Sequence, residues 1–487
     1  MRMRVFALCA LVAAAATAQI VVDAQRTVRT VPAGFFGINA AIWDDQFVSA
    51  ATKDVLTKMS VRMLRFPGGS ASDEYHFLAN RSEGSTFPWP VDFNTFAGTA
   101  TDLGVDVMIT VNYGTGTAEE AASWVEYSNV NHRRGFRYWE IGNEVYGSWE
   151  TDNRTRPHDP KTYAEAVAAY MMAMKRFDPS IRIGIPVVPS EDAFANYDEE
   201  VVANPRTGID RRGWTPLVLS RLRELESLPD FVSYHRYEYD HNDEDDARLL
   251  TAAGTWKSDI ATLRQILNDY AGNAGRTIEI LCTENNSVRS RPGKQTVNLV
   301  NAFYLADSLG QALQTEVSRV LWWDLRNGKE FNNNNSNGLY GWRTYGDYGV
   351  VSPANERYPT SYAAELFGSF AKPGDVVVEA TSTSASLSAY AVKRTDGSVA
   401  VLLINKSSDQ ATDATIQFKG FTPSLEAISL LSYGIPNDIA STGITRSTIP
   451  ALVVHAGPYS GNVVIASPAP APAPAPPPSR RRSVVHR

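Results

Sequence analysis

Cysteine and long apolar runs are nearly absent from this 487-residue chain. Of the two cysteines, Cys9 falls in an N-terminal segment that we expect to be removed, which leaves Cys282 without an intrachain disulfide partner. After the N-terminal segment, no stretch approaches the ~18 consecutive apolar residues that a membrane span needs. We therefore expect no membrane span, and a stability that comes from a large core.

The chain also lacks an excess of positive charge and the common metal and nucleotide motifs. Its 46 Lys and Arg against 53 Asp and Glu give a net charge of −7, which argues against a nucleic-acid partner. The seven histidines are scattered, without an H-x-x-x-H pair, and no phosphate-binding glycine loop is present. The acidic stretch Tyr237–Asp246 lacks the glycine of an EF-hand and reads as a solvated loop. We predict no metal and no cofactor.

The two ends of the chain carry their own signals. Arg2 and Arg4, then the apolar run Val5–Ala15, then Ala16-Thr17-Ala18 follow the order of a secretory signal peptide. This predicts a signal peptide at residues 1–18, cleavage before Gln19, and a secreted protein. Residues 468–487 form a Pro-rich spacer with a basic end, for which we expect disorder; a wall-facing basic patch or the remnant of a lost domain are alternatives.

Between residues 31 and 371, short apolar segments alternate with helical ones. The strand candidates are Phe35–Trp43, Val61–Phe66, Val105–Asn112, Tyr138–Ile141, Ile181–Val188, Asp230–His235, Ile278–Glu284 and Arg319–Leu325. The helix candidates are Val48–Met59, Asn94–Leu103, Ala118–Asn129, Pro160–Phe177, Pro216–Leu228, Trp256–Tyr270 and Thr296–Gln314. Eight strand–helix units predict the α/β class and a closed (β/α)₈ TIM barrel. A doubly wound open sheet is the alternative.

From residue 372 to 467 the pattern changes to short strands separated by turn residues. Seven such segments lie between Val376 and Ser467, and Asp396-Gly397 is a hairpin signal. They predict a C-terminal β-sandwich. The alternating segment at residues 19–30 has no place in the barrel and is expected to join this sandwich.

Two of the barrel strands end in a glutamate. Glu144 follows the fourth strand, and Glu284 ends the seventh. Because the carboxyl ends of barrel strands share one rim, the two carboxylates can face each other at about 5 Å, the separation used in retaining glycoside hydrolysis. One would donate a proton to the leaving group while the other attacks the anomeric carbon. The alternative is that one or both only bind cations or cap loops.

Other polar and aromatic side chains fall at strand ends on the same rim. The candidates for substrate binding are Arg65, Asn112, Asn143, His235, Tyr237 and Trp323. Together they would offer a cation, amides, an imidazole, a phenol and an indole to a polyol. Asn143, beside Glu144, could donate to the hydroxyl next to the anomeric carbon. The glycine pair after Arg65 would let the backbone approach a ligand closely.

WEIGNE in the fourth strand and TE in the seventh resemble glycoside hydrolase clan A. Within it, VNYGTGTAEEAASWVEYSN and YWEIGNEVYG are most similar to the family 51 α-L-arabinofuranosidases. The resemblance implies that Glu144 is the acid/base and Glu284 the nucleophile. It also implies that Asn143, Arg65, His235 and Tyr237 hold the matching family positions. The chain departs from the family at Ser70, where the motif has Asn, and in the first strand, which lacks a sugar-binding Glu. Both departures concern sugar recognition.

These observations predict a secreted retaining glycosidase that acts on plant cell-wall polysaccharide or its oligosaccharides, an α-L-arabinofuranosidase in the first place. Trp43, Trp89, Trp149 and Trp323 would also suit the cleft of an endo-β-1,4-glucanase or a xylanase. A non-catalytic carbohydrate-binding protein is the alternative of another class. The sequence leaves the exact sugar and the oligomeric state open.

Overall fold

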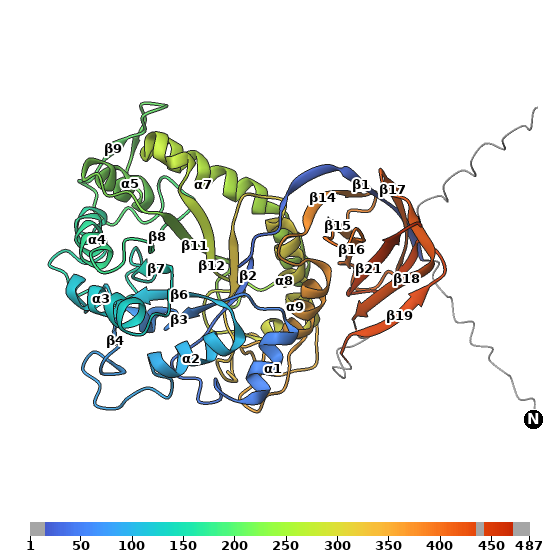
Figure 1. The fold of residues 1–487 in the computed structure, drawn as a ribbon, viewed down its shortest axis with the longest axis horizontal. Helices are drawn as coiled ribbons and strands as arrows, with labels where there is room; N and C mark the ends of the chain where they lie inside the picture. The colour runs from blue at the N-terminus through green and yellow to red at the C-terminus, as the bar shows by residue number, and fades with distance from the viewer. Residues whose placement is uncertain (1–14, 435–442, 471–487) are drawn as a thin grey trace, which may run out of the picture.

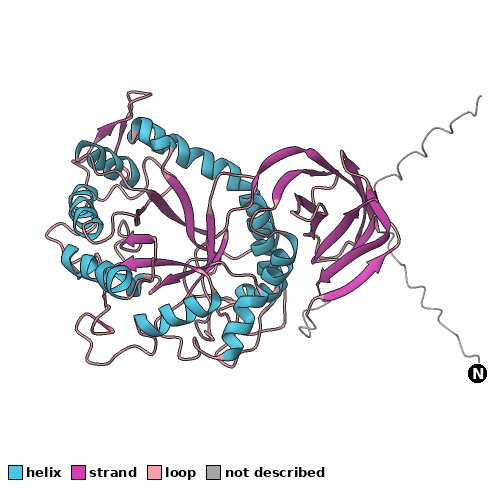
Figure 2. Ribbon diagram, viewed as in Figure 1, coloured by secondary structure: helices cyan, strands magenta, loops and turns pink. Residues whose placement is uncertain are grey.

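The computed structural model describes residues 15–434 and 443–470 as two bodies side by side (Figure 1). Helices surround a central set of strands in the first body, whereas the second body consists of strands (Figure 2). The predicted signal residues 1–14 and the tail residues 471–487 lie outside the described residues. Within the described ranges, no helix combines the length and the apolar character needed to cross a bilayer.

The first body is a closed barrel of eight parallel strands, which confirms the predicted fold class. Its strands in chain order are β2 (Phe36–Asn39), β3 (Met63–Phe66), β6 (Asp106–Val111), β7 (Tyr138–Ile141), β8 (Arg182–Pro186), β11 (Phe231–Tyr239), β12 (Glu279–Val288) and β13 (Arg319–Trp322). β11 and β12 run past their predicted ends and stay paired as far as Tyr239 and Val288. His235, Tyr237 and Glu284 therefore stand on regular strands rather than on loops.

Helices cover the outside of the barrel and begin at well-formed caps. They are α1 (Ala50–Lys58), α2 (Phe93–Leu103), α3 (Ala118–Val125), α4 (Pro160–Lys175), α5 (Trp214–Glu224), α6 (Asp246–Ala252), α7 (Trp256–Tyr270), α8 (Leu299–Ala312) and α9 (Pro359–Phe370). Side chains of Ser49, Asp92, Thr117 and Asp159 accept the first free backbone N–H groups, as preferred N-cap residues do. α6 and α9 are additional to the predicted helices.

An apolar layer fills the amino end of the barrel. It consists of Met63, Met108, Tyr138, Phe231, Leu281 and Leu321, one from each of six strands. The other two strands carry glycines there: a Cβ on Gly184 would lie 1.9 Å from the Phe231 ring, and one on Gly37 would lie 2.7 Å from Leu321. Because side chains alternate along a strand, residues two positions further on point into the same interior, nearer the carboxyl rim. That alternation brings Arg65, Glu140 and Thr283 into one polar layer.

The second body holds β1 (Ala16–Thr30), β14 (Val376–Ser382), β15 (Leu387–Lys393), β16 (Val399–Asn405), β17 (Thr412–Lys419), β18 (Pro423–Tyr433), β19 (Thr445–Ile449), β20 (Val453–Ala456) and β21 (Ser460–Pro468). In hydrogen-bonding terms they form a single sheet, in the order β19-β18-β21-β16-β15-β14-β1-β17-β20. Buried residues from both halves of the sheet share one apolar core, so the sheet is folded over into the predicted sandwich. β19 is additional, and all its residues except Ile449 are polar and exposed.

β1 crosses from the barrel to the sandwich (Figure 1). It pairs antiparallel with β14 and parallel with β17, so the start of the described chain lies inside the C-terminal sheet. Ala16–Ala18, the predicted cleavage site, pairs with Thr412–Ala414 of β17. At the other end of the strand, the Arg29 guanidinium donates to the carbonyl of Val317 on the barrel at 2.7 Å.

α8 and α9 lie between the barrel strands and the sandwich (Figure 1). The Tyr390 hydroxyl, from β15, donates to the fully buried Asp307 of α8 at 2.6 Å. The Tyr390 ring lies flat on α8 at Gly310, where a Cβ would come within 2.4 Å of it. A buried polar contact and a close aromatic contact at α8 are thus among the contacts that join the two bodies.

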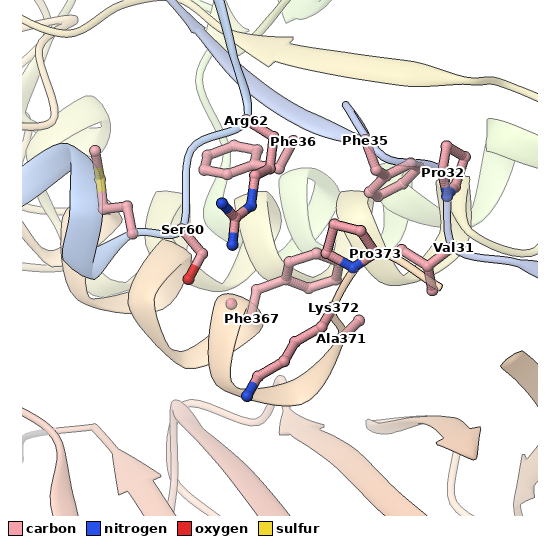
Figure 3. Close-up of a pocket in the computed structure, with 12 residues that line it drawn as sticks. Val31, Pro32, Phe35, Phe36, Ser60, Arg62, Phe367, Ala371, Lys372 and Pro373 are labelled. Carbon is pink, nitrogen blue, oxygen red and sulfur yellow. The ribbon is translucent and has the colours of Figure 1, made fainter. Parts of the chain in front are cut away.

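A shallow apolar pocket lies at the amino end of the barrel, on the side of α9. Phe35, Phe36 and Phe367 form its walls, with Arg62 and Lys372 at its edges (Figure 3). None of the predicted site residues lines it. The amino end of a TIM barrel usually serves stability, whereas catalytic residues lie at the opposite, carboxyl rim.

Candidate active site

Arg65 organises the polar layer at the carboxyl end of the barrel. Its Nη1 donates to Glu284 at 2.8 Å and to Asn39 at 3.0 Å, and its Nη2 donates to Asn143 at 2.8 Å. Its Nε and Nη2 both approach Glu140 at 2.8 Å. The side chain has no exposed surface, and all five of its N–H donors are used. Contact between Arg65 and a substrate stays a prediction, whereas its hold on Glu284 and Asn143 is observed.

The charge on Arg65 is matched by the two carboxylates that it binds. Burial alone would lower the pKa of this guanidinium, but the charges of Glu140 and Glu284 raise it above its ordinary value. Burial would likewise raise the pKa of Glu140, yet the charge of Arg65 holds it below its usual range. Arg65 and Glu140 therefore form a buried ion pair beneath the rim.

Glu144 lies at the turn after β7 in a strained backbone conformation, with φ at +42°. Its carboxylate accepts hydrogen bonds from His235 Nδ1 at 2.8 Å, Trp149 Nε1 at 2.8 Å and the Tyr146 hydroxyl at 3.2 Å. Burial would raise its pKa, but the hydrogen bond and charge of His235, followed by the two other donors, lower it overall. Positive φ at a non-glycine residue costs free energy and occurs preferentially at functional sites.

His235 stands between the two glutamates that the sequence singled out. Its Nδ1 is 2.8 Å from Glu144 Oε1 and 3.5 Å from Glu284 Oε2. Burial would lower the pKa of the imidazole, but the charge of Glu284 and the hydrogen bond and charge of Glu144 raise it. Its Nε2 is buried without a hydrogen-bond partner among the described residues. The imidazole and Glu144 thus share one proton within the site.

Glu284 is held as an acceptor by two donors. Besides Arg65 Nη1, the Tyr237 hydroxyl donates to its Oε2 at 2.6 Å. The carboxylate is 5% exposed. The two donors fix the orientation of the carboxylate, as a nucleophile requires.

Asn143 is fixed from three sides. Its backbone N–H donates to Asp73 Oδ2 at 3.0 Å, and its Oδ1 accepts from Arg65. Its Nδ2 donates to Glu150 Oε1 at 3.0 Å. The amide is therefore oriented by the protein before any ligand arrives.

The structure does not bring Asn112 into this group. Its Oδ1 accepts from the backbone N–H groups of Thr115 and Gly116, both at 2.9 Å, and its Nδ2 donates to the Thr115 hydroxyl at 2.8 Å. An Asn after a strand often builds the following turn in this way. The polar atoms of Asn112 thus form the loop after β6, and substrate binding by Asn112 stays a prediction.

Trp323 lies at the rim, partly exposed, and packs against the glycine pair. A Cβ on Gly69 would be 2.4 Å from the Trp323 ring. Trp43 meets the same indole edge to face, with 6.3 Å between ring centroids. The lack of a side chain at Gly69 thus makes room for the Trp323 indole. The indole lies at the rim beside the site.

Several residues of the site escape sequence reasoning. They are Asp73, Glu140, Tyr146 and Glu150, together with the role of Trp149 as a donor to Glu144. Glu140 carried a usable signal, since an acidic residue inside an apolar strand needs a buried partner. The others lie on loops, whose course the sequence pattern does not predict. Over the described part of the chain, no three His, Cys, Asp or Glu side chains gather as metal ligands.

Comparisons with known proteins agree with this architecture. A family model described as the glycosyl hydrolase family 30 beta sandwich domain matches residues 374–433, within the sandwich. The probable alpha-L-arabinofuranosidase C of Aspergillus fumigatus is 25% identical over 198 residues, which are 35% of this chain and 38% of the fungal protein. The chain thus matches less than two fifths of that relative's length.

Solved structures match nearly the whole chain. The GH51 alpha-L-arabinofuranosidase from Thermotoga petrophila aligns with a TM-score of 0.69 and 19% identity, over 92% of this chain and 100% of that one. A xyloglucanase of glycoside hydrolase family 44 from Paenibacillus polymyxa aligns with a TM-score of 0.68 and 14% identity, over 93% and 100%. At these identities the likeness shows the fold. The predicted resemblance to glycoside hydrolases, family 51 included, is confirmed.

Proposed function

We propose that this protein is a retaining glycoside hydrolase in which Glu284 is the nucleophile and Glu144 the acid/base. One observation carries the proposal: a single His235 nitrogen reaches both carboxylates, at 2.8 and 3.5 Å. The two distances together bound the separation of the carboxylate oxygens, and this bound is below the ~6.5 Å minimum separation of the carboxyl groups in inverting glycosidases. The separation therefore suits direct attack and leaves little room for a water between carboxylate and sugar.

Each carboxylate has surroundings that suit its role. Hydrogen bonds from Arg65 and Tyr237 aim Glu284, so that its carboxylate can form the glycosyl–enzyme bond at the anomeric carbon. The proton shared by His235 and Glu144 passes from Glu144 to the departing oxygen. Once Glu284 is esterified it carries no charge, and Glu144 takes a proton from the water that releases the sugar. The hydrogen bonds from Trp149 and Tyr146 favour that ionised form.

Within this reaction class, we propose an α-L-arabinofuranosidase acting on plant cell-wall polysaccharide or its oligosaccharides. The Aspergillus relative and the Thermotoga structure that bear this name support it. An endo-β-1,4-glucanase or xylanase is the second candidate. It is favoured by Trp149, whose indole is 54% exposed beside Glu144, with the Phe194 ring 5.8 Å away as a further platform.

The mechanism is tested with Glu284→Ala. Removing the nucleophile should lower kcat on an aryl glycoside by at least ~10⁴-fold, in line with other covalent catalysts. Azide or formate should restore part of the turnover, with a glycosyl azide or formate as the product. The matched control is Glu279→Ala, a glutamate at the opposite end of the same strand, which should keep its activity.

A panel of substrates separates the candidates. Release of nitrophenol from the α-L-arabinofuranoside, with the backbone polymer intact, supports the first. Falling viscosity of a β-glucan or a xylan supports the second. Binding of wall polysaccharide without release of reducing sugar would contradict both and identify a non-catalytic carbohydrate-binding protein. Full activity in Glu284→Ala would overturn the assignment of the nucleophile.

We also propose that the protein is secreted, on the charge and apolar order of its first 18 residues. Cleavage before Gln19 would remove the pairs of Ala16–Ala18 with β17 but leave Gln19–Asp23 paired with β17. The pairing of β1 with β14, which begins at Ile20, would stay whole.

A further inference from the structure

Glu150 is a buried acid next to the proposed catalytic residues, with no assigned role. It lies in the loop after β7 and is 5% exposed. Its Oε1 accepts from the Ser70 hydroxyl at 2.9 Å and from Asn143 Nδ2 at 3.0 Å. Its Oε2 is buried without a partner among the described residues. The residue before it, Trp149, donates to Glu144, so this dipeptide contacts both Asn143 and Glu144.

The orientation of the Asn143 carboxamide follows from its two partners. Arg65 can only donate, so the atom facing it must be Oδ1. Nδ2 then points the other way and carries two hydrogens. One of them goes to Glu150, which leaves the second for a ligand. Without an acceptor at Glu150, the carboxamide would be held by Arg65 alone and could rotate about that contact.

We propose that Glu150 is a positioning residue: by accepting one hydrogen of the Asn143 carboxamide, it directs the other toward the sugar hydroxyl beside the reacting carbon. This rests on the proposed function. Ser70 completes the arrangement, because its hydroxyl donates to the same Oε1. A short Ser at this position leaves room for the Glu150 carboxyl behind the rim.

The protonation of Glu150 agrees with this role. Burial, then the charges of Asp73 and Glu144, raise the pKa of Glu150 to about 9. The acids whose charges act on it are Asp73 after β3, Glu144 after β7 and Glu284 on β12. Arg65 binds the opposite atom of the Asn143 carboxamide. At neutral pH Glu150 is thus an uncharged acid whose Oε1 still accepts two hydrogen bonds.

The test compares Glu150→Ala and Glu150→Gln on an aryl α-L-arabinofuranoside and on its 2-deoxy analogue. Glu150→Ala should lower kcat on the parent substrate about 10- to 100-fold, with a much smaller change in KM. On the analogue, which lacks the hydroxyl, the loss should be under about threefold by the same argument. Glu150→Gln keeps an acceptor oxygen and should recover most of the activity. The fall in rate that we expect for the wild-type enzyme near pH 9, where Glu150 ionises, should be absent from Glu150→Gln.

Glu74→Ala is the matched control. Glu74 is a neighbouring acid that accepts from Thr151 and makes no hydrogen bond to Asn143. We expect it to affect both substrates equally and little. Equal losses on parent and analogue in Glu150→Ala, or no loss at all, would overturn the proposal.

A crystal structure of Glu150→Ala tests the positioning directly, without relying on activity. We expect the Asn143 carboxamide to turn away from its wild-type orientation. An unchanged Asn143 would contradict the proposal even if turnover falls. Conversely, a wild-type protein that cleaves no glycoside would contradict the proposed function. The crystal structure of Glu150→Ala would still show whether Glu150 orients Asn143.

Discussion

Arg65 illustrates how one residue gains its role from distant parts of the chain. The sequence identifies it as a cation at a strand end, which suggests contact with a substrate. The structure uses its five donors on Glu140, Glu284, Asn143 and Asn39 instead. A planar fork of donors can hold several acceptors at fixed angles, and a lysine cannot. Arg65 therefore orients Glu284 and Asn143, the groups to which we assign catalysis and substrate binding.

Asp347 is a second single residue with a testable consequence, the dependence of folding stability on pH. It has no exposed surface, and burial raises its pKa to about 6. The unfolded chain loses this proton at its ordinary, lower pKa, so the native state binds more protons in between. Stability should therefore fall as pH rises from about 4 to about 6, by roughly 3 kcal/mol for this group. Below that window the effect is absent.

Asp347→Asn should remove this contribution, since the amide keeps an acceptor for the backbone N–H groups of Gly328 and Gly349. Urea unfolding at pH 4 and pH 7 measures it. The difference between variant and wild type should favour the variant at pH 7 and vanish at pH 4. The same difference at both pH values would contradict the raised pKa.

At the scale of elements, apolar periodicity locates the barrel strands well. Each of the eight predicted strands overlaps an observed one. The prediction fails where polar residues continue a strand, as in β11 and β12, because their last residues pair with each other above the barrel rather than with the core. It also misses α9, whose burial against α8 and the sandwich is a tertiary property, and β19, in which Ile449 is the single apolar residue.

Gly184 tests the packing between strands. A Cβ there would lie 1.9 Å from the Phe231 ring in the apolar layer. Gly184→Ala should therefore destabilise the barrel by about 1–3 kcal/mol through overpacking. The free energy of unfolding in urea measures the loss.

Gly98→Ala is the matched control, because a Cβ at this position of α2 meets nothing within 4 Å. Alanine in an exposed helix interior should stabilise by about 0.5–1 kcal/mol. If both substitutions moved stability in the same direction, the layer would not be packed as described.

At the scale of the whole molecule, the sandwich and the barrel depend on each other. β1 precedes the barrel in sequence but pairs within the C-terminal sheet. The buried contact from Tyr390 to Asp307 connects β15 to α8. The two bodies should therefore unfold together rather than one by one.

Tyr390→Phe tests this connection. The ring and its packing on Gly310 remain, but Asp307 loses a buried donor, which should cost about 1–3 kcal/mol. Scanning calorimetry should show one transition at a lower temperature. Tyr113→Phe is the control, because its hydroxyl is buried without a partner among the described residues. A second transition that appears separately would contradict joint unfolding.

The proposed secretion is also tested on the whole molecule. N-terminal sequencing of protein recovered from the medium should begin at Gln19. A chain that stays in the cell with Met1 intact would contradict the secretion proposal.

The sequence by itself determined where the eight barrel strands lie and that Glu144 and Glu284 fall toward the carboxyl side of two of them. Periodicity and strand ends are local, so a single chain reveals them. Only the tertiary structure decided which groups surround the pair. Arg65 and Glu284 are 219 residues apart, and they meet because the barrel closes. Closure of the barrel also places His235 between the two glutamates and Glu150 beside Asn143. The hydrogen bonds of Asn112 within its own loop are likewise visible only in the structure. The sequence thus identified the two proposed catalytic glutamates, whereas the residues that contact them come together only in the folded chain.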